Sequence, residues 1–171
     1  MTSDSSGQKD RNFKLESFFS LNLDLLCIAD LEGYFIKLNK SWENILGYSV
    51  KELQKKIFLE FVHPDDMEST LNAMKALGEN KPVINFINRY RCKDNTYKYI
   101  EWRSQPYEGM IYAAARDITD KIQKQIIIEE QEENFRTFFE TIDDLIFVTT
   151  EQGMIINTNR AVTEKLGYSA Q

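Results

Sequence analysis

Few side chains in this 171-residue sequence have the chemistry of a catalytic group. His63 is the only histidine, so any Ser/His/Asp or Cys/His set would depend on it. The sequence has no nucleophile-elbow pattern that would present a serine beside such a base. It also lacks the glycine-rich loops that cradle phosphates in nucleotide-binding enzymes. We therefore predict that this stretch of chain is not itself an enzyme.

Two pairs of adjacent aspartates could bind a metal or divide acid and base work between them. Asp65 and Asp66 follow Pro64, where a helix is expected to start, and acidic side chains are favoured in a first helical turn. Asp143 and Asp144 stand just before a predicted strand. We assign helix-start and turn roles to these pairs and predict no metal site.

The two cysteines, Cys27 and Cys92, lie in strand-like runs without metal-ligand spacing, which indicates free thiols. A net charge of −6 argues against a nucleic-acid partner, because nucleic-acid binding needs a basic patch. No apolar run reaches membrane-spanning length, and residues 1–12 lack the apolar core of a signal peptide. We expect a soluble, cytoplasmic segment with a flexible N-terminus.

Aromatic side chains gather in the segments that follow residue 82, and both faces of the strand predicted at 96–105 carry them. They either pack a small core or line a ligand cavity opposite an apolar helix stripe. Aromatics left on the outer face would need a cover, from residues 13–23 or from another subunit. The candidate pocket residues are Met67, Leu71, Met74, Phe86, Tyr90, Trp102 and Tyr112.

The elements that must position these residues follow from periodicity and turn signals. Short apolar runs at 25–29 and 34–38 flank Gly33, which predicts a β-hairpin. Asn39 is a predicted helix cap, and the spacing of Ser49 and Glu52 predicts a capping box.

A helix is predicted from Pro64 to Gly78, with Leu71 and Met74 buried on its apolar stripe. Strands are predicted at 83–93, 96–105 and 110–115, and a lead-in helix at 13–23.

The run from Met110 to Ala115 then leads directly into a helix-forming segment. We predict that Arg116, Asp117, Ile118 and Thr119 form a signal junction, where Asp117 or Thr119 accepts hydrogen bonds from the first free helix amides.

This order of elements resembles a PAS domain with its C-terminal PAC motif. The motifs that carry the resemblance are Asp30-x-x-Gly33, Asn39, Gly47-Tyr48-Ser49, His63-Pro64-Asp65-Asp66, Tyr90-Arg-Cys-Lys-Asp94, Ile100-Glu-Trp-Arg103 and Asp117-Ile-Thr119. The resemblance implies an α+β fold, with a five-stranded antiparallel sheet, helices on one face and a small enclosed cavity. Asn95 stands where the family usually has glycine, and asparagine tolerates the left-handed conformation that such a turn requires.

The resemblance also bears on cofactors. Haem-binding PAS domains are expected to place their ligand within the helix or nearby strands, whereas His63 stands before Pro64 at a helix start. The Asn-Cys-Arg-Phe motif of the flavin photosensors is not found around Cys27 or Cys92. We therefore expect neither haem nor covalent flavin, and the cofactor, if any, stays open.

An internal repeat appears when the sequence is shifted by 120 residues. Eleven identical residues then align without a gap: Phe18, Phe19, Asp24, Leu25, Gly33, Ile36, Asn39, Leu46, Gly47, Tyr48 and Ser49 match Phe138, Phe139, Asp144, Leu145, Gly153, Ile156, Asn159, Leu166, Gly167, Tyr168 and Ser169. We therefore divide the chain into a flexible N-terminus and lead-in helix (1–17), a PAS domain with its PAC motif (18–119), a signalling linker helix (120–139) and the start of a second PAS unit (140–171).

The functional expectation is a sensory module of a prokaryotic signal-transduction protein. By resemblance it would sense a small ligand or a redox or energy signal and act on a histidine kinase beyond residue 171, or alternatively on a diguanylate cyclase. A ligand-free dimerisation or interaction module is the rival of a different class. A homodimer is expected because the linker has several apolar residues: Ile118, Ile122, Ile126, Ile128, Phe135 and Phe139.

Overall fold

The computed structural model describes the backbone of residues 5–167 and the side chains of residues 13–167. Contacts within the chain divide it at residue 120 into two compact units. The first unit holds a complete sheet and its helices, and the second holds most of a long helix, a hairpin and a short helix.

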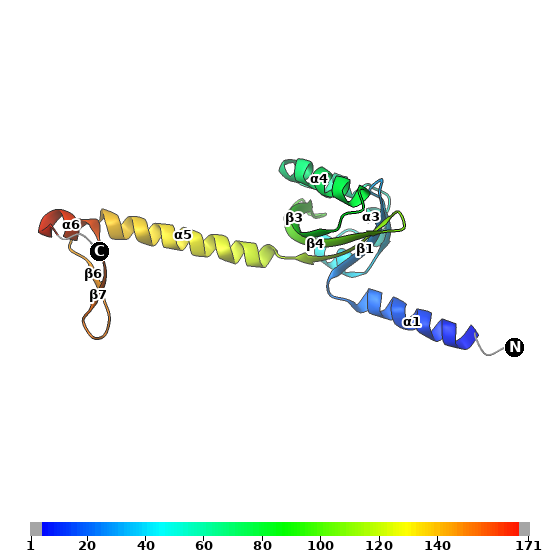
Figure 1. Ribbon diagram of the computed structural model, residues 1–171, viewed down its shortest axis with the longest axis horizontal. Coiled ribbons are helices and arrows are strands. Elements are labelled where there is room, and N and C mark those ends of the chain that lie inside the picture. Colours follow the sequence, from blue (N-terminus) through cyan, green and yellow to red (C-terminus); the bar gives the residue numbers. More distant parts are fainter. Residues whose placement is uncertain (1–4, 168–171) are drawn as a thin grey trace. The chain divides into compact units, whose positions relative to one another are not determined.

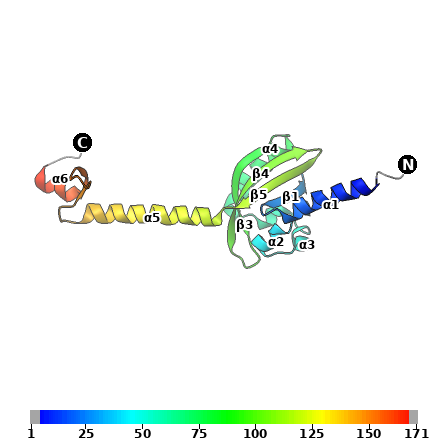
Figure 2. The same cartoon turned by 90° about the horizontal axis from the view of Figure 1, so that it is seen from below.

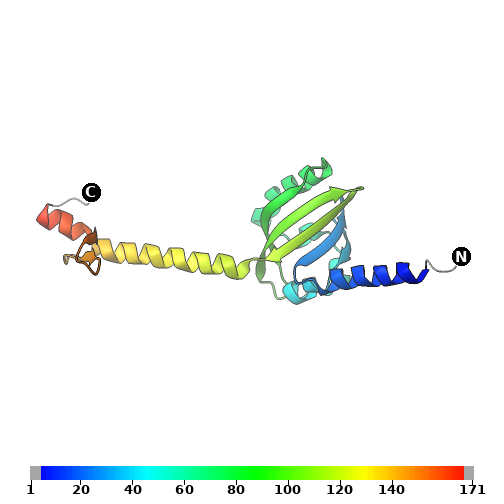
Figure 3. The same cartoon turned by 60° about the horizontal axis from the view of Figure 1, so that its bottom comes forward.

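A five-stranded antiparallel sheet forms the centre of the first unit, with strand order β2-β1-β5-β4-β3 (Figure 1). This confirms the predicted fold, including the central position of the strand that starts at Met110. Figure 3 shows β4 and β5 running side by side through the middle of the sheet. The strands are β1 (Leu25–Asp30), β2 (Phe35–Leu38), β3 (Val83–Arg91), β4 (Tyr97–Tyr107) and β5 (Met110–Asp117).

The segments between β2 and β3 form the helical part of this unit. They are α2 (Ser41–Leu46), α3 (Val50–Leu53), two 3-10 turns, η1 (Phe58–Phe61) and η2 (Pro64–Asp66), and α4 (Met67–Gly78). Helix α4 packs against β3 and β4, and α2 packs against β1 (Figure 2). Because strand side chains alternate between faces, Ile111, Ala113 and Ala115 of β5 are buried while Tyr112 between them is exposed.

Local turn chemistry fixes the hairpin and the helix ends. Gly33 has φ +101° in the β1–β2 turn, a conformation that L side chains rarely adopt. Ser49 and Glu52 form the predicted capping box at the start of α3. Asn95 has φ +67° in the β3–β4 turn, as the predicted left-handed conformation requires.

Asn39 does not cap a helix, contrary to the prediction. Its side chain instead accepts a hydrogen bond from the Leu26 N–H and donates to the carbonyls of Asn22 and Asp24, at 3.1, 3.2 and 2.8 Å. The N-cap position, just before α2, is occupied by Lys40, which makes no side-chain cap bond. The buried Asn39 amide therefore holds the entry of β1, where backbone groups would otherwise lie unpaired.

Two predictions about apolar side chains were wrong. Leu71 is 48% exposed because the buried side of α4 passes through Thr70 and Leu77 instead. The lead-in helix α1 spans Ser5–Leu21, beginning earlier than predicted, and its Phe13, Leu15, Phe18 and Leu21 side chains are exposed. Phe19 is half-buried, and Lys37 Nζ of β2 lies 4.8 Å from the centre of its ring.

The linker helix α5 spans Thr119–Thr141, close to the predicted range. In the second unit β6 (Phe147–Thr149) pairs with β7 (Ile155–Thr158), and α6 (Arg160–Leu166) follows. These elements repeat β1, β2 and α2 at the predicted offset of 120 residues, although Tyr168 and Ser169 lie outside the described residues. Within residues 5–167, no helix combines the length and apolar character needed to cross a membrane.

Candidate ligand cavity and signal junction

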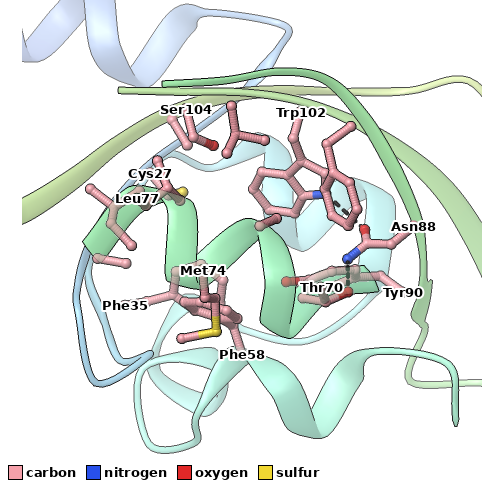
Figure 4. Close-up of a pocket in the computed structure, with 16 residues that line it drawn as sticks. Cys27, Phe35, Phe58, Thr70, Met74, Leu77, Asn88, Tyr90, Trp102 and Ser104 are labelled. Atoms are coloured by element: carbon pink, nitrogen blue, oxygen red, sulfur yellow. Dashed lines mark hydrogen bonds between the residues drawn. The ribbon is translucent and has the colours of Figure 1, made fainter. Parts of the chain in front are cut away.

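A small, mostly apolar cavity lies between α4 and the inner face of the sheet, with a volume of about 50 Å³ (Figure 4). Residues from β1, β2, β3, β4, β5, η1 and α4 surround it, so nearly every element of the first unit contributes to its wall. The apolar lining consists of Cys27, Ala29, Phe35, Phe58, Ala73, Met74, Leu77, Val83, Phe86, Tyr90, Trp102, Ile111 and Ala113. Three further polar side chains, Thr70, Asn88 and Ser104, complete it.

The structure brings together four of the seven candidate pocket residues. Met74, Phe86, Tyr90 and Trp102 line the cavity. Met67 packs against the core but does not line the cavity. Leu71 lies on the exposed side of α4. Tyr112 points from the opposite face of the sheet, where its ring contacts Tyr107 at 6.2 Å between centroids.

A buried chain of hydrogen bonds crosses one wall of the cavity (Figure 4). The Trp102 indole N–H donates to Asn88 Oδ1 at 2.7 Å, and Asn88 Nδ2 donates to Thr70 Oγ1 at 3.1 Å. The Thr70 hydroxyl in turn donates to the Asp66 carbonyl at 2.7 Å. This chain connects β4, β3 and α4, so the two sides of the cavity are held by satisfied polar groups rather than by packing alone.

Arg89, next to Asn88 on β3, fastens the same strand to the start of α4. Its backbone N–H and Nε donate to Asp66 Oδ2 at 2.7 and 2.9 Å, and Nη2 donates to Asp66 Oδ1 at 2.7 Å. These bonds from Arg89 hold the pKa of the Asp66 carboxyl below its usual range. Asp66 is therefore a paired helix-start carboxylate, in agreement with its predicted structural role.

Two hydroxyls and one thiol face the cavity without hydrogen-bond partners among the described residues. Tyr90 and Ser104 are 2% and 8% exposed, and Figure 4 shows the Tyr90 hydroxyl pointing into the cavity. Burial raises the pKa of the Tyr90 phenol well above its usual value. Burial also raises the pKa of the Cys27 thiol to about 12, so this sulfur is a neutral thiol rather than a nucleophilic thiolate.

Sequence reasoning missed Asn88 and Ser104, although a usable signal existed for both. Phe86, Asn88 and Tyr90 share one phase of β3, and Trp102 and Ser104 share one phase of β4. A polar residue within an otherwise aromatic strand face indicates either a buried hydrogen bond or a ligand contact. Applying that rule to the strand phases would have placed both residues in the cavity wall.

The signal junction joins the end of β5, the start of α5 and strand β4. The Thr119 N–H donates to Asp117 Oδ1 at 2.9 Å, so Asp117 accepts from the first helix amide as predicted. Thr119 plays a different part, because its Oγ1 accepts from the Tyr99 N–H of β4 at 2.9 Å and donates to Asp117. The Ile118 N–H also donates to the Tyr99 carbonyl at 2.9 Å.

Ion pairs surround this junction. Asp117 Oδ2 lies 3.4 Å from Lys98 Nζ, and Arg116 donates to Asp24 at 3.1 Å through Nε. Arg116 is 67% exposed in its side chain, so its pair with Asp24 contributes little to stability. Asp117 is more enclosed and links two elements, which makes it the more informative position for mutagenesis.

His63 accepts a hydrogen bond from the Asp65 N–H through Nδ1 at 3.2 Å, at the start of η2. Its ring contacts Tyr97 at 4.6 Å between centroids, and it does not line the cavity. The side chain thus has the capping role that the sequence favoured.

Comparisons with known proteins agree with this architecture. The PAS fold family matches residues 35–113, and a PAS domain family matches residues 133–171. Sporulation kinase E of Bacillus subtilis is 24% identical over 148 residues, which cover 85% of this chain and 20% of the kinase. This chain therefore spans about a fifth of the length of that relative.

Two solved structures are similar to the first part of the chain. The PAS domain of an HTR-like protein from Haloarcula marismortui has a TM-score of 0.58 and 21% identity, covering 66% of this chain and 96% of that domain. A domain of a sensory box sensor histidine kinase/response regulator from Geobacter sulfurreducens has a TM-score of 0.57 and 16% identity, covering 64% and 96%. At these identities the likeness shows the fold.

Proposed function

Because the chain belongs to the PAS domain family, we propose that its first unit senses a small molecule in the cavity and relays its presence through α5 to a downstream histidine kinase. The likeness to sporulation kinase E and the sensory fold support this proposal. A diguanylate cyclase in place of the kinase is the second candidate effector. We also propose a cytoplasmic location, in keeping with two free, buried thiols.

One observation carries the relay: strand β4 holds both the cavity and the junction. Trp102 lines the cavity, and Tyr99, three residues earlier on the same strand, binds Ile118 and Thr119 through its backbone. A ligand that displaces Trp102 or its Asn88 partner would shift β4 and with it the two bonds that set the start of α5. A small rotation of that helix is a change that a dimeric effector could read.

We further propose that the protein dimerises in parallel through α5. Of the six apolar residues named for the linker, Ile118 and Phe139 are buried within their own units. Ile126, Ile128 and Phe135 stay 44–59% exposed and are free to meet a second copy. The spacing approximates a heptad only weakly, so we expect a micromolar dimer, measurable by sedimentation.

The relay can be tested by a double-mutant cycle in the full-length protein. Ala73→Leu fills the cavity from α4, and should change the autophosphorylation rate severalfold because it mimics an occupied site. Combining it with Asp117→Ala and Thr119→Val should abolish that response in a protein that still folds, although it removes the three hydrogen bonds of the junction. The expected cost is about 1 kcal/mol for each lost hydrogen bond.

A matched control exists elsewhere in the same unit. Asp94 accepts from the Thr96 N–H and hydroxyl at 2.9 and 2.6 Å, the same local arrangement as Asp117 and Thr119. Asp94→Ala with Thr96→Val therefore removes the same two local hydrogen bonds in a turn that makes no hydrogen bond to α5, and should leave the response to Ala73→Leu intact. Loss of the response in this control, or its survival in the junction variant, would refute the relay.

A further inference from the structure

We infer that the cavity takes a small, uncharged, largely apolar molecule that carries one hydrogen-bonding group, of the class of short-chain alcohols and ketones. This inference rests on the proposed sensing role, because it names the ligand class of the same cavity. Three observations support this ligand class: the cavity wall carries no charge, the cavity is small, and two hydroxyls of its wall have no partner among the described residues.

The wall contains no ionisable group that is charged at neutral pH. Among its residues only Cys27 and Tyr90 titrate, and burial raises the pKa of both, so thiol and phenol stay neutral. The Asp66 carboxylate and the Arg89 guanidinium, on residues adjoining the wall, are paired with each other and do not line the cavity. A carboxylate or phosphate ligand would therefore lose its hydration without gaining a counter-charge.

The volume limits the size of the ligand. An apolar cavity of about 150 Å³ holds benzene, whereas this cavity measures about 50 Å³. In this conformation it therefore accommodates a molecule on the order of two to four non-hydrogen atoms.

The hydroxyls of Tyr90 and Ser104 supply the polar contact. Both side chains are more than nine-tenths buried, line the cavity and bind none of the described residues. The neighbouring polar groups Asn88, Thr70 and the Trp102 indole already bind one another. The two oxygens are accessible from the cavity, so an alcohol or carbonyl oxygen bound there could form a hydrogen bond with one of them, which makes such a ligand more favourable than a pure hydrocarbon.

The chain provides its own spectroscopic probe, because it has two tryptophans, Trp42 and Trp102, of which only Trp102 lines the cavity. Protein labelled with 5-fluorotryptophan gives two ¹⁹F signals, assigned with Trp102→Phe. Titration with 2-propanol should shift the Trp102 signal saturably, with half-saturation on the order of 1–10 mM. Acetate has the same number of non-hydrogen atoms and the same branching but carries a charge, and should produce no saturable shift.

Variants locate the binding. Tyr90→Phe should weaken 2-propanol binding about threefold to tenfold, while Tyr112→Phe, on the opposite face of the sheet, should leave it unchanged. Ala73→Leu should abolish the shift, while Ala76→Leu on the same helix but outside the cavity should preserve it. Melting curves test whether each variant folds. If Ala73→Leu does not fold, Ser104→Val takes its place as the variant that fills the cavity.

Three results would each overturn the inference. The first is a saturable shift of the Trp102 signal with acetate, and the second is a shift with 2-propanol that does not saturate. The third is a 2-propanol shift of undiminished affinity in a folded Ala73→Leu or Ser104→Val variant. These results are separable from failure of the relay. If acetate binds while the junction variant still abolishes the response to Ala73→Leu, only the inferred ligand class is refuted. If 2-propanol binds while the junction variant leaves that response intact, only the relay is refuted.

Discussion

Residues 22–47 and residues 142–167 form the same local structure in very different surroundings. In each, a hairpin is followed by a short helix that ends in a left-handed glycine, Gly47 at φ +77° and Gly167 at φ +73°. In each, a buried asparagine before the helix binds the backbone of three upstream residues. Asn39 binds Asn22, Asp24 and Leu26, and Asn159 binds Ile142, Asp144 and Ile146.

The two segments differ in how far their apolar side chains are buried. Leu25 is 0% exposed and its counterpart Leu145 is 42% exposed. The hairpin of the first segment continues into a sheet through β5, β4 and β3, whereas the second hairpin, within the described residues, forms a two-stranded sheet. Helix α4, which covers the cavity, likewise belongs only to the first unit.

This difference separates what local sequence encodes from what the rest of the fold supplies. The asparagine bridge and the glycine turn require only neighbouring residues, so they form in both segments. Burial of the strands requires the long pairing between β1 and β5, which joins residues about 85 positions apart. A cavity can therefore exist only where those later strands are present.

Equivalent leucines should show the largest contrast in stability. Leu46 is 1% exposed and Leu166, its partner in the repeat, is 46% exposed. Leu46→Ala should lower the free energy of unfolding of the first unit by about 2–5 kcal/mol, because it removes buried methyl groups and leaves a cavity. Leu166→Ala should change it by less than about 0.5 kcal/mol. Urea unfolding followed by tryptophan fluorescence reports the first unit, since Trp42 and Trp102 both lie in it.

Equal losses in the two leucine variants would show that the first unit draws stability from the second. The contrast would then reflect a shared core rather than two separately stabilised segments.

The bridging asparagines should give a smaller contrast. Asn39→Ala leaves the Leu26 N–H and two carbonyls without their partner inside the first unit, and should cost about 2–3 kcal/mol. Asn159→Ala removes the same bonds beside exposed strands, where water can replace them, so its main effect should be local.

Amide hydrogen exchange distinguishes these outcomes. Asn159→Ala should accelerate exchange at Ile146 while leaving Leu26 protected, and Asn39→Ala should do the reverse together with a lower midpoint of unfolding. An Asn39→Ala variant as stable as the original chain would mean that the bridge forms without contributing to stability.

The sequence predicted those parts of the fold that depend on short-range signals. Gly33, Gly47, Asn95 and the Ser49–Glu52 box follow from backbone conformation and capping alone, and the antiparallel sheet follows from the resemblance and the turns. The site was predicted less completely. The large aromatic residues Trp102 and Tyr90 were identified from the sequence. The side of α4 that faces the sheet was not predicted correctly.

The side of α4 that faces the sheet depends on tertiary packing. An apolar stripe through Met67, Leu71 and Met74 is compatible with more than one rotation of the helix, because Thr70 is polar by type yet buried when its hydroxyl binds the Asp66 carbonyl. Likewise Thr119 binds a strand amide rather than a helix amide, a choice set by the position of Tyr99 on β4. Asn88, which also binds the Thr70 hydroxyl, and Tyr99 lie 18 and 20 residues from Thr70 and Thr119, so local propensity could not identify these partners.

The smallest expected effect concerns removal of the second segment altogether. Deleting residues 141–171 should shift the melting temperature of the first unit by less than about 1 °C, because a loss of 1 kcal/mol would lower it by about 4–8 °C. The first unit draws its core from β1–β5 and the helices between them, and its cavity wall includes no residue beyond Ala113. The two ¹⁹F tryptophan signals should keep their positions in the shortened chain for the same reason. A shift of several degrees, or movement of the Trp102 signal, would show that the second segment stabilises the first unit. The asparagine bridges of the two segments would then both contribute to the stability of one folded structure.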